Sequence, residues 1–288
     1  MDEYKVKKAI SVVILTKNEE LAIKGCIESA SMYDQIIVLD SDSDDLTCEI
    51  SRNLGAQVIN FSWNKNYPKK KQWALELKEV RNEWILLLDA DERITTNLEL
   101  EISEFIARED IESYGAARAN LSYHFSSKKL SHGHRVNKVF LINKNKCNFP
   151  TIDDLQVLNM WEVEGHYQPI VKGKVYKFHS LLEHIDPGTL YDYFSRHNRY
   201  SDWEAYLESN PQILNQVSNS RSTQGKIFNK VPFKPLVFFL YSYFIRQGWK
   251  DKQAGFDYAV AQSFYYWLIS AKRREISNHA KTKDMKES

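Results

Sequence analysis

The first part of the chain alternates short apolar runs with amphipathic segments. Four runs, at residues 9–15, 35–39, 57–60 and 84–88, predict buried strands, because three of them are almost wholly apolar and rich in β-branched residues or leucine. Helices are predicted between and after them, at residues 19–30, 45–54, 69–78 and 97–107. Strands that alternate with helices form βαβ units, so we predict a parallel sheet covered by helices.

Three of the four predicted strands end in clusters of polar residues. The sequence TKNEE (16–20) follows the first strand, DSDSDD (40–45) the second and DADE (89–92) the fourth. The carboxyl ends of parallel strands meet at one edge of a sheet, and ligands of such sheets bind beyond that edge. We therefore expect the three clusters to converge on one binding site.

The pattern changes after residue 110. Residues 114–123 and 135–142 indicate strands of a mixed sheet, and residues 151–168 indicate an irregular loop. Residues 191–208 and 255–274 predict helices, and the polar, lysine-rich tail after Arg274 is expected to fray. The second part of the chain should therefore complete the sheet and end in helices.

The DADE cluster carries the clearest chemistry. Asp89 and Asp91 are two residues apart at the end of a strand, so their side chains should point the same way. Mg²⁺ and Mn²⁺ prefer oxygen ligands and commonly bind one or two carboxylates together with substrate phosphates. We predict that Asp91 and Asp89 bind such a metal, which would neutralise a departing diphosphate.

The other two clusters offer side chains for the rest of a nucleotide. Asp40 is placed to accept hydrogen bonds from a base or a ribose, and Glu19 to bond the nucleoside. Helix initiation would also explain Glu19. With the neighbouring polar positions, the predicted substrate-binding residues at this edge are Thr16, Asn18, Glu19, Asp40, Asp42 and Asp89.

Composition narrows the class of protein. The 288 residues are 43% hydrophobic and 27% charged, which is typical of a folded protein. A formal net charge of +1 gives no basic field for nucleic acid. The three dispersed cysteines indicate free thiols in a reducing compartment, and the amino terminus does not resemble a secretory signal. We therefore expect a cytoplasmic protein.

Residues 235–245 (PLVFFLYSYFI) form an apolar, aromatic segment between Lys234 and Arg246. Eleven residues in a helix are too short for a hydrocarbon core of ~30 Å at ~1.5 Å per residue. Basic ends with nearby Trp and Tyr favour a helix lying in the membrane interface, whereas a core or dimer helix is the alternative. A peripheral position on the cytoplasmic face of the inner membrane is therefore one expectation.

Three ordered motifs give the sequence a family resemblance. VVILTKNEE, IIVLDSDSDDLT and WILLLDADE together resemble family 2 glycosyltransferases, which have the GT-A fold. The branch that includes lipopolysaccharide-core glucosyltransferases is the most similar, and the resemblance covers most of residues 9–205. In that branch a histidine precedes a helix with an Asn-Arg-Tyr-Ser run. The corresponding residues here are His184 and 198–201.

The resemblance implies an α/β fold, with a GT-A-like, Rossmann-like nucleotide-sugar domain and a mostly parallel sheet. On this basis we expect that domain at residues 1–205, its nucleotide-binding half at 1–110 and its acceptor half at 111–205. A helical region at 206–288 would follow. The donor is expected to be a nucleotide-sugar, most simply a UDP-sugar, and the acceptor a saccharide or a lipid-linked saccharide of the cell envelope or lipopolysaccharide core.

The resemblance also implies an inverting reaction, which requires a carboxylate base. In the branch, that base is a glutamate in a Val-His-Glu setting, but this chain reads WEVEGHYQP and departs from the pattern. We take Glu164 as the candidate catalytic base, with Glu162 and Asp154 behind it. His166 and His184 are candidates for substrate binding. Lys70, in the run of lysines at the start of a predicted helix, is a candidate for the diphosphate.

Two other interpretations stay open. A metal-dependent nucleotidyltransferase could use the same paired aspartates, although TKNEE lacks the glycines of a phosphate-binding loop. A non-catalytic, saccharide-binding relative is the other, and intact Asp89 and Asp91 argue against it. The sequence therefore predicts a metal-dependent glycosyltransferase that uses Mg²⁺ or Mn²⁺.

Overall fold

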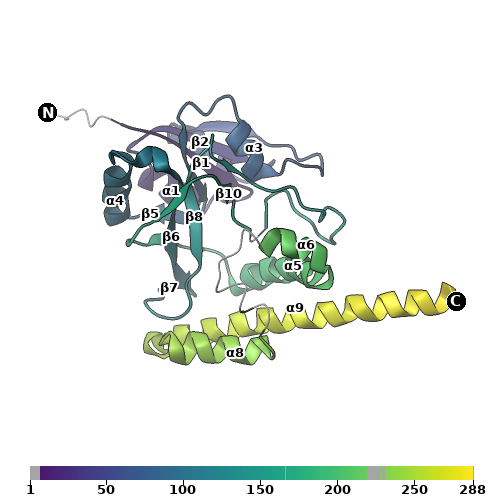
Figure 1. Ribbon diagram of the computed structural model, residues 1–288. Helices are drawn as coiled ribbons and strands as arrows, with labels where there is room; N and C mark the ends of the chain where they lie inside the picture. The colour runs from purple at the N-terminus through teal and green to yellow at the C-terminus, as the bar shows by residue number, and fades with distance from the viewer. Residues whose placement is uncertain (1–6, 166, 219–227, 229–230, 288) are drawn as a thin grey trace.

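The structure, a computed structural model, describes residues 7–165, 167–218, 228 and 231–287. A ten-stranded sheet lies at its centre (Figure 1), in the order β3-β2-β1-β4-β8-β6-β12-β5, with β7 and β11 also paired to β6. The first strands are β1 Lys8–Thr16, β2 Tyr33–Asp40, β3 Gln57–Asn60, β4 Trp84–Asp89 and β5 Glu92–Ile94. The later strands of this sheet are β6 Tyr114–Phe125, β7 Lys128–Lys129, β8 Asn137–Asn143, β11 Lys174–Lys177 and β12 Leu182–His184.

Strands β1 to β4 are parallel, with β1 between β2 and β4. Each of these strands is followed by a helix, and the short strand β5 lies between β4 and its helix. These helices are α1 Ile23–Ser29, α2 Thr47–Asn53, α3 Lys70–Glu76 and α4 Thr96–Ile106. The predicted α/β class and mostly parallel centre are confirmed. The first helix is shorter than predicted, because residues 17–22 form the loop above β1.

Successive side chains of β1 point to opposite faces of the sheet, and both faces are buried. Val12 and Ile14 lie in a core cluster with residues of α1 and α4. Val13 and Leu15 lie in a second cluster with residues of α3 and with Trp203. All four β1 side chains are almost inaccessible to solvent. Two buried faces explain why this strand reads as a continuous apolar run.

The antiparallel strands β8 and β6 extend the sheet beyond β4, and the short strand β12 joins β6 to β5. A separate two-stranded sheet is formed by β9 Cys147–Asn148 and β10 Ile170–Val171. Between them, the described residues of 149–169 contain no helix or strand, as predicted for the loop at 151–168. This loop passes over the start of α3, where Lys70 N–H donates to Glu162 O at 2.9 Å.

The last third of the described chain is helical. It contains α5 Leu190–Ser209, α6 Pro211–Ser218, α8 Lys234–Leu240, the π-helix η2 Tyr241–Ile245, the 3₁₀ turn η3 Gly248–Asp251 and α9 Lys252–Glu287; a further 3₁₀ turn, η1 Ile111–Ser113, precedes β6. Both α5 and α8 pack along α9 (Figure 1). The boundary that we expected after residue 205 falls inside α5, and the division of the chain there stays a proposal.

The prediction of a frayed tail after Arg274 was wrong. The helix α9 continues to Glu287. No glycine or proline follows Gly255, and Ala, Lys, Arg, Glu and Met, which have high helix propensity, are frequent in the last turns. Polarity alone therefore did not indicate disorder in this segment.

Candidate active site

The polar clusters converge as predicted. In the sheet, Thr16 of β1 is in register with Asp40 of β2, and Leu15 is in register with Asp89 of β4. The three strands therefore end at one edge with their polar residues side by side. This is the edge at which parallel sheets bind ligands.

Asp40 is buried and held by its neighbours. Its carboxylate accepts hydrogen bonds from Thr16 Oγ1 at 2.8 Å, Ser43 Oγ at 2.6 Å and Ser43 N–H at 2.8 Å. Burial alone would raise the pKa of Asp40, but the hydrogen bonds from Ser43 and Thr16 outweigh it and hold the pKa below its usual value. Asp40 is thus a fixed negative charge with most of its acceptor capacity in use.

The loops after β1 and β2 are joined to each other. Asn18 N–H donates to Ser43 Oγ at 2.8 Å, and Asn18 Oδ1 accepts from Asp44 N–H at 3.0 Å. Asn18 and Asp42 have φ angles of 55° and 53°, a left-handed conformation that Asn and Asp adopt more readily than most residues. Backbone geometry therefore gives Asn18 and Asp42 a structural task in addition to the predicted contact with substrate.

Glu19 lies in the field of the DADE cluster. Burial, together with the charges of Asp91 and Asp89, raises its pKa to about 8, although Arg196 of α5 opposes the rise. Arg196 forms an ion pair with Asp186 in the segment before α5. The start of α5 therefore faces the same edge of the sheet as Glu19 and the aspartates.

A lysine that the sequence analysis did not single out bridges two acids of the cluster. Lys138 Nζ of β8 lies 2.7 Å from Asp89 Oδ2 and 2.6 Å from Glu92 Oε2. Lys138, and then Lys71, hold the pKa of Asp89 below its usual value against the effect of burial. Glu92 is fully buried, and burial raises its pKa to about 7. Asp89 is therefore a charged and oriented carboxylate before any ligand arrives.

Asp91 is brought against His184 by the short strand β12. His184 is in register with Glu92, Ile185 N–H donates to Asp91 O at 2.7 Å, and His184 Nε2 lies 3.2 Å from Asp91 Oδ2. Asp91 Oδ1 and His184 Nδ1 are buried and have no hydrogen-bond partner among the described residues. Buried polar atoms are normally satisfied, so this pair is suited to receive a ligand.

These residues fit a divalent cation of the kind predicted. A carboxylate oxygen without a partner, a second carboxylate two residues away and an imidazole are all donors that Mn²⁺ accepts, and the carboxylates also suit Mg²⁺. No three His, Cys, Asp or Glu side chains form a metal-binding group within the described part of the chain. A cation at Asp91 would therefore complete its coordination with ligand phosphate oxygens and water.

The lysines at the start of α3 are divided between two tasks. Lys70 is buried, and its Nζ donates to Thr16 O and to Ser41 Oγ, both at 2.6 Å, so it ties together the ends of β1 and β2. Burial lowers the pKa of Lys70 to about 8. The positive charge of Lys71 acts on Asp89 and lowers the pKa of that carboxyl. Burial lowers the pKa of Lys71, as it does that of Lys70. The predicted contact of Lys70 with a diphosphate stays a prediction.

Glu164 caps the start of α3. Its carboxylate oxygens accept from Lys71 N–H at 2.7 Å and from Gln72 N–H at 2.8 Å, and its side chain is almost fully buried. Burial raises its pKa, although Lys71 and the backbone N–H groups oppose the rise. Its role as catalytic base stays a prediction. His166, the neighbouring substrate-binding candidate, lies outside the described residues.

Asp154, a further candidate base, is the centre of a buried network. Its carboxylate accepts from Tyr67 Oη at 2.9 Å, from Trp203 Nε1 at 2.8 Å and from Lys69 Nζ at 3.2 Å. Both Asp154 and Lys69 are inaccessible to solvent. The network joins the loop at 149–169 to α3 and α5, which is a structural task.

We expect the substitution Asp154→Ala to destabilise the protein by about 3–5 kcal/mol, because it would leave the Lys69 ammonium buried without its partner. Urea denaturation followed by circular dichroism measures this free energy. The exposed neighbour Asp153 provides the control, and Asp153→Ala should change the free energy of unfolding by less than about 0.5 kcal/mol. Equal stability of the two variants would contradict the structural role.

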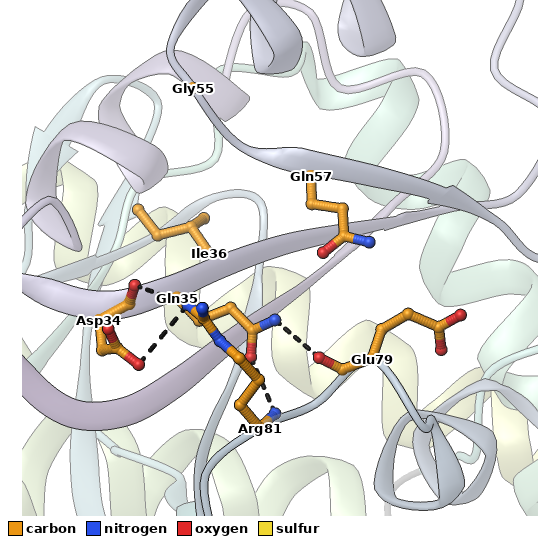
Figure 2. A pocket seen from close by; sticks show the side chains of 7 residues that line it. All are labelled: Asp34, Gln35, Ile36, Gly55, Gln57, Glu79 and Arg81. Atoms are coloured by element: carbon orange, nitrogen blue, oxygen red, sulfur yellow. Dashed lines mark hydrogen bonds and ion pairs between the residues drawn. The ribbon is translucent and has the colours of Figure 1, made fainter.

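A separate polar hollow lies at the amino ends of β2 and β3, the edge opposite the aspartates. Figure 2 shows its lining residues, which are Asp34, Gln35, Ile36, Gly55, Gln57, Glu79 and Arg81. Arg81 pairs with Asp34 at 3.6 Å, and Gln35 Nε2 donates to Glu79 O at 2.7 Å. Its polar groups are thus largely paired with one another.

The chain is similar in sequence to known glycosyltransferases. A model of glycosyl transferase family 2 matches residues 11–167, more than half of the chain. An uncharacterized glycosyltransferase of Rickettsia felis is 30% identical over 277 residues, which are 92% of this chain and 89% of that protein. The lipopolysaccharide core biosynthesis glycosyltransferase LpsC of Rhizobium meliloti is 26% identical over 275 residues, 92% of each chain.

Among solved structures, glucosyl-3-phosphoglycerate synthase from Mycobacterium tuberculosis, in complex with Mn²⁺, UDP and glucosyl-3-phosphoglycerate, is similar to part of the chain. The match has a TM-score of 0.32 and 23% sequence identity. It covers 41% of this chain and 44% of that chain, less than half of either.

Proposed function

The chain belongs to glycosyl transferase family 2, and from that premise we propose an inverting, metal-dependent transfer of a sugar from a UDP-sugar. The acceptor is a saccharide or a lipid-linked saccharide in the synthesis of lipopolysaccharide core or another cell-envelope polysaccharide. The LpsC relative, a lipopolysaccharide core enzyme that aligns over nearly its whole length, supports this choice of acceptor.

One observation carries the proposal. Asp89, Asp91 and His184 meet at the edge of the sheet where Thr16 and Asp40 end the neighbouring strands. A nucleoside bound over β1 and β2 would direct its diphosphate toward β4, where the aspartates lie. The nucleobase and ribose would then bind over β1 and β2, and the diphosphate leaving group would bind at β4.

Asp91 and Asp89 would hold the cation, and His184 is placed to join them. When bound, Mg²⁺ or Mn²⁺ supplies positive charge that stabilises the departing diphosphate. Lys138 keeps Asp89 ionised and oriented through its 2.7 Å ion pair. Besides the predicted Lys70, two further cationic side chains near this edge could meet phosphate oxygens: Lys71, and Arg196 once it exchanges Asp186 for the ligand.

Glu164 is our proposed base for the acceptor hydroxyl. Two facts support it: burial raises its pKa, which favours proton uptake, and the charge of Lys71 acts on both Glu164 and Asp89, so the three groups are near one another. Each of its two carboxylate oxygens accepts one hydrogen bond from the start of α3, which leaves a lone pair on each.

A ligand screen followed by a transfer assay tests the proposed function. Purified protein is heated with a panel of nucleotide-sugars, each with Mn²⁺ or with a chelator. We expect a UDP-sugar with Mn²⁺ to raise the melting temperature, because ligand that binds only the native state stabilises it. The same donor should be hydrolysed slowly with metal and not with chelator. Binding without any turnover would indicate a non-catalytic relative instead.

The substitution Asp40→Ala should weaken UDP binding by about 1–3 kcal/mol, the usual contribution of a hydrogen bond to a charged group. Isothermal titration calorimetry with UDP and Mn²⁺ measures the change. Asp34→Ala, at the opposite edge of the sheet (Figure 2), is the matched control and should leave the affinity unchanged. Unchanged UDP affinity in a folded Asp40→Ala protein would refute the assignment of Asp40 to the nucleoside.

A further inference from the structure

The outer side of α9 is apolar where a surface helix is usually polar. Phe256, Val260, Phe264 and Trp267 follow one another at spacings of four, four and three residues, and each is more than 40% exposed. With 3.6 residues per turn, this spacing puts them on one face. The opposite face, which includes Tyr258 and Tyr265, is buried against the rest of the protein.

A second apolar stripe continues this surface on α8 and η2. Leu236, Leu240 and Phe244 are exposed at a spacing of four residues, and Ile245 at the end of η2 is 72% exposed. The rings of Phe239 and Tyr243 contact the ring of Phe256, so the two stripes adjoin. The helices α8 and α9 that carry them lie side by side (Figure 1). We call the two stripes together the outer face.

The outer face extends to the first turns of α5. Phe194 and Phe264 are in edge contact, with ring centroids 5.9 Å apart. Leu190 and Tyr191, at the start of α5, are 51% and 80% exposed. Since His184 ends the strand just before α5, the outer face approaches the same side of the molecule as the aspartate edge.

Basic side chains surround the outer face. Arg246, Lys250 and Lys252 lie at the corner between η2 and α9, and Arg273 and Arg274 lie beyond Trp267; all five are exposed. Of the acids nearby, Asp251 is paired with His132, Asp257 accepts from Gln253, and Glu208 is shared between Arg273 and Lys234. The surroundings of the outer face therefore carry a surplus of positive charge.

We propose that the outer face docks the protein on an anionic lipid bilayer, with α8 and α9 lying in the interface. Exposed apolar patches of this extent are uncommon on soluble monomers and mark interaction surfaces. Aromatic and aliphatic side chains between lysines and arginines match the boundary between acyl chains and anionic headgroups. None of the described helices is both long and apolar enough to cross a bilayer. Docking on the bilayer does not depend on the proposed function. Docking would also bring the active site to a lipid-linked acceptor, and this second role rests on the proposed function.

Vesicle flotation of the purified full-length protein tests the proposal. Vesicles of phosphatidylcholine alone are compared with vesicles that also contain phosphatidylglycerol. We expect the protein to float with the anionic vesicles and not with the neutral ones. The double substitution Ile245→Ser and Trp267→Ser should lower the partition coefficient at least about tenfold, because each side chain would lose its burial in lipid. Arg246→Glu with Lys250→Glu should abolish the preference for anionic vesicles.

The matched control replaces exposed apolar residues elsewhere, Leu100→Ser with Ile170→Ser, and should float like the wild type. Phe238 is unsuitable for this test because it is buried against other aromatic rings. Equal flotation of the wild type and the Ile245/Trp267 variant would overturn the proposal. A wild-type dimer in sedimentation experiments that becomes monomeric in that variant would also overturn it, because the outer face would then contact a second copy.

Donor binding separates this inference from the proposed function. The Ile245/Trp267 variant should keep the Mn²⁺-dependent thermal shift with UDP, since these exposed residues lie in η2 and α9 whereas the aspartates lie at the end of strand β4 of the sheet. Lost flotation with a retained shift is the expected result. A protein that floats but gives no shift with any nucleotide-sugar refutes the proposed function alone.

Discussion

Replacement of Glu164 by glutamine is expected to lower kcat for sugar transfer by about 10²–10⁴-fold, the usual contribution of a positioned general base. Inversion requires the acceptor hydroxyl to lose its proton as it attacks. In the proposed mechanism, a cation at Asp91 would serve the leaving diphosphate on the opposite face of the sugar. An amide cannot take up that proton, so kcat should fall. Donor affinity should persist, because the base acts on the acceptor and not on the donor.

The stability of the Glu164→Gln variant must be measured as well as its kinetics, because Glu164 also caps a helix. Its carboxylate also receives two N–H groups at the start of α3. Loss of a helix cap costs about 0.5–2 kcal/mol, so a modest fall in melting temperature is expected. Glu162→Gln is the control, and it should retain wild-type kcat. A Glu164→Gln protein that has lost stability but keeps near wild-type kcat would show that Glu164 is a cap and no base.

The substitution Asp91→Asn is expected to lower transfer by about 10²–10³-fold at saturating Mn²⁺, comparable to removal of a principal electrostatic contact in a transition state. Asn keeps the shape of Asp91 but lacks the negative charge that we propose for binding the cation. The variant should also lose the Mn²⁺-dependent part of the thermal shift with UDP, which reports binding independently of turnover.

Asp44→Asn provides the matched control for Asp91. Asp44 is an exposed acid in the loop after β2, at the same edge of the sheet. Its removal changes the net charge of that edge equally and should change activity by less than about twofold. Transfer by Asp91→Asn within a factor of two of the wild type would rule out the assignment of the metal to Asp91.

The sequence predicted those features that depend on local pattern. The apolar runs located β1 to β4 within two residues, and the polar residues at their ends identified the edge where Thr16, Asp40 and Asp89 meet. Parallel pairing then follows from the alternation of strands and helices. The family resemblance added His184, which periodicity alone would not have found because β12 has only three residues.

The sequence did not predict contacts between distant segments. Lys138 is a single lysine near the start of an apolar strand, and only the pairing of β8 with β4 puts it beside Asp89. A charged residue inside an otherwise apolar strand is the signal that would have found it. Likewise, Asp154 was a candidate base in a predicted loop, but Trp203 Nε1 and Lys69 Nζ bond to its carboxylate and make it a buried anchor.

The strand order also bears on how firmly Asp91 is held. Only Ala90 and Asp91 separate β4 from β5 along the chain, yet β8, β6 and β12 lie between these strands in the sheet. The five strands and this two-residue link form a closed circuit of backbone hydrogen bonds and covalent bonds. Any displacement of Asp91 must strain the whole circuit. The backbone of these five strands therefore fixes the position of Asp91 before any ligand binds.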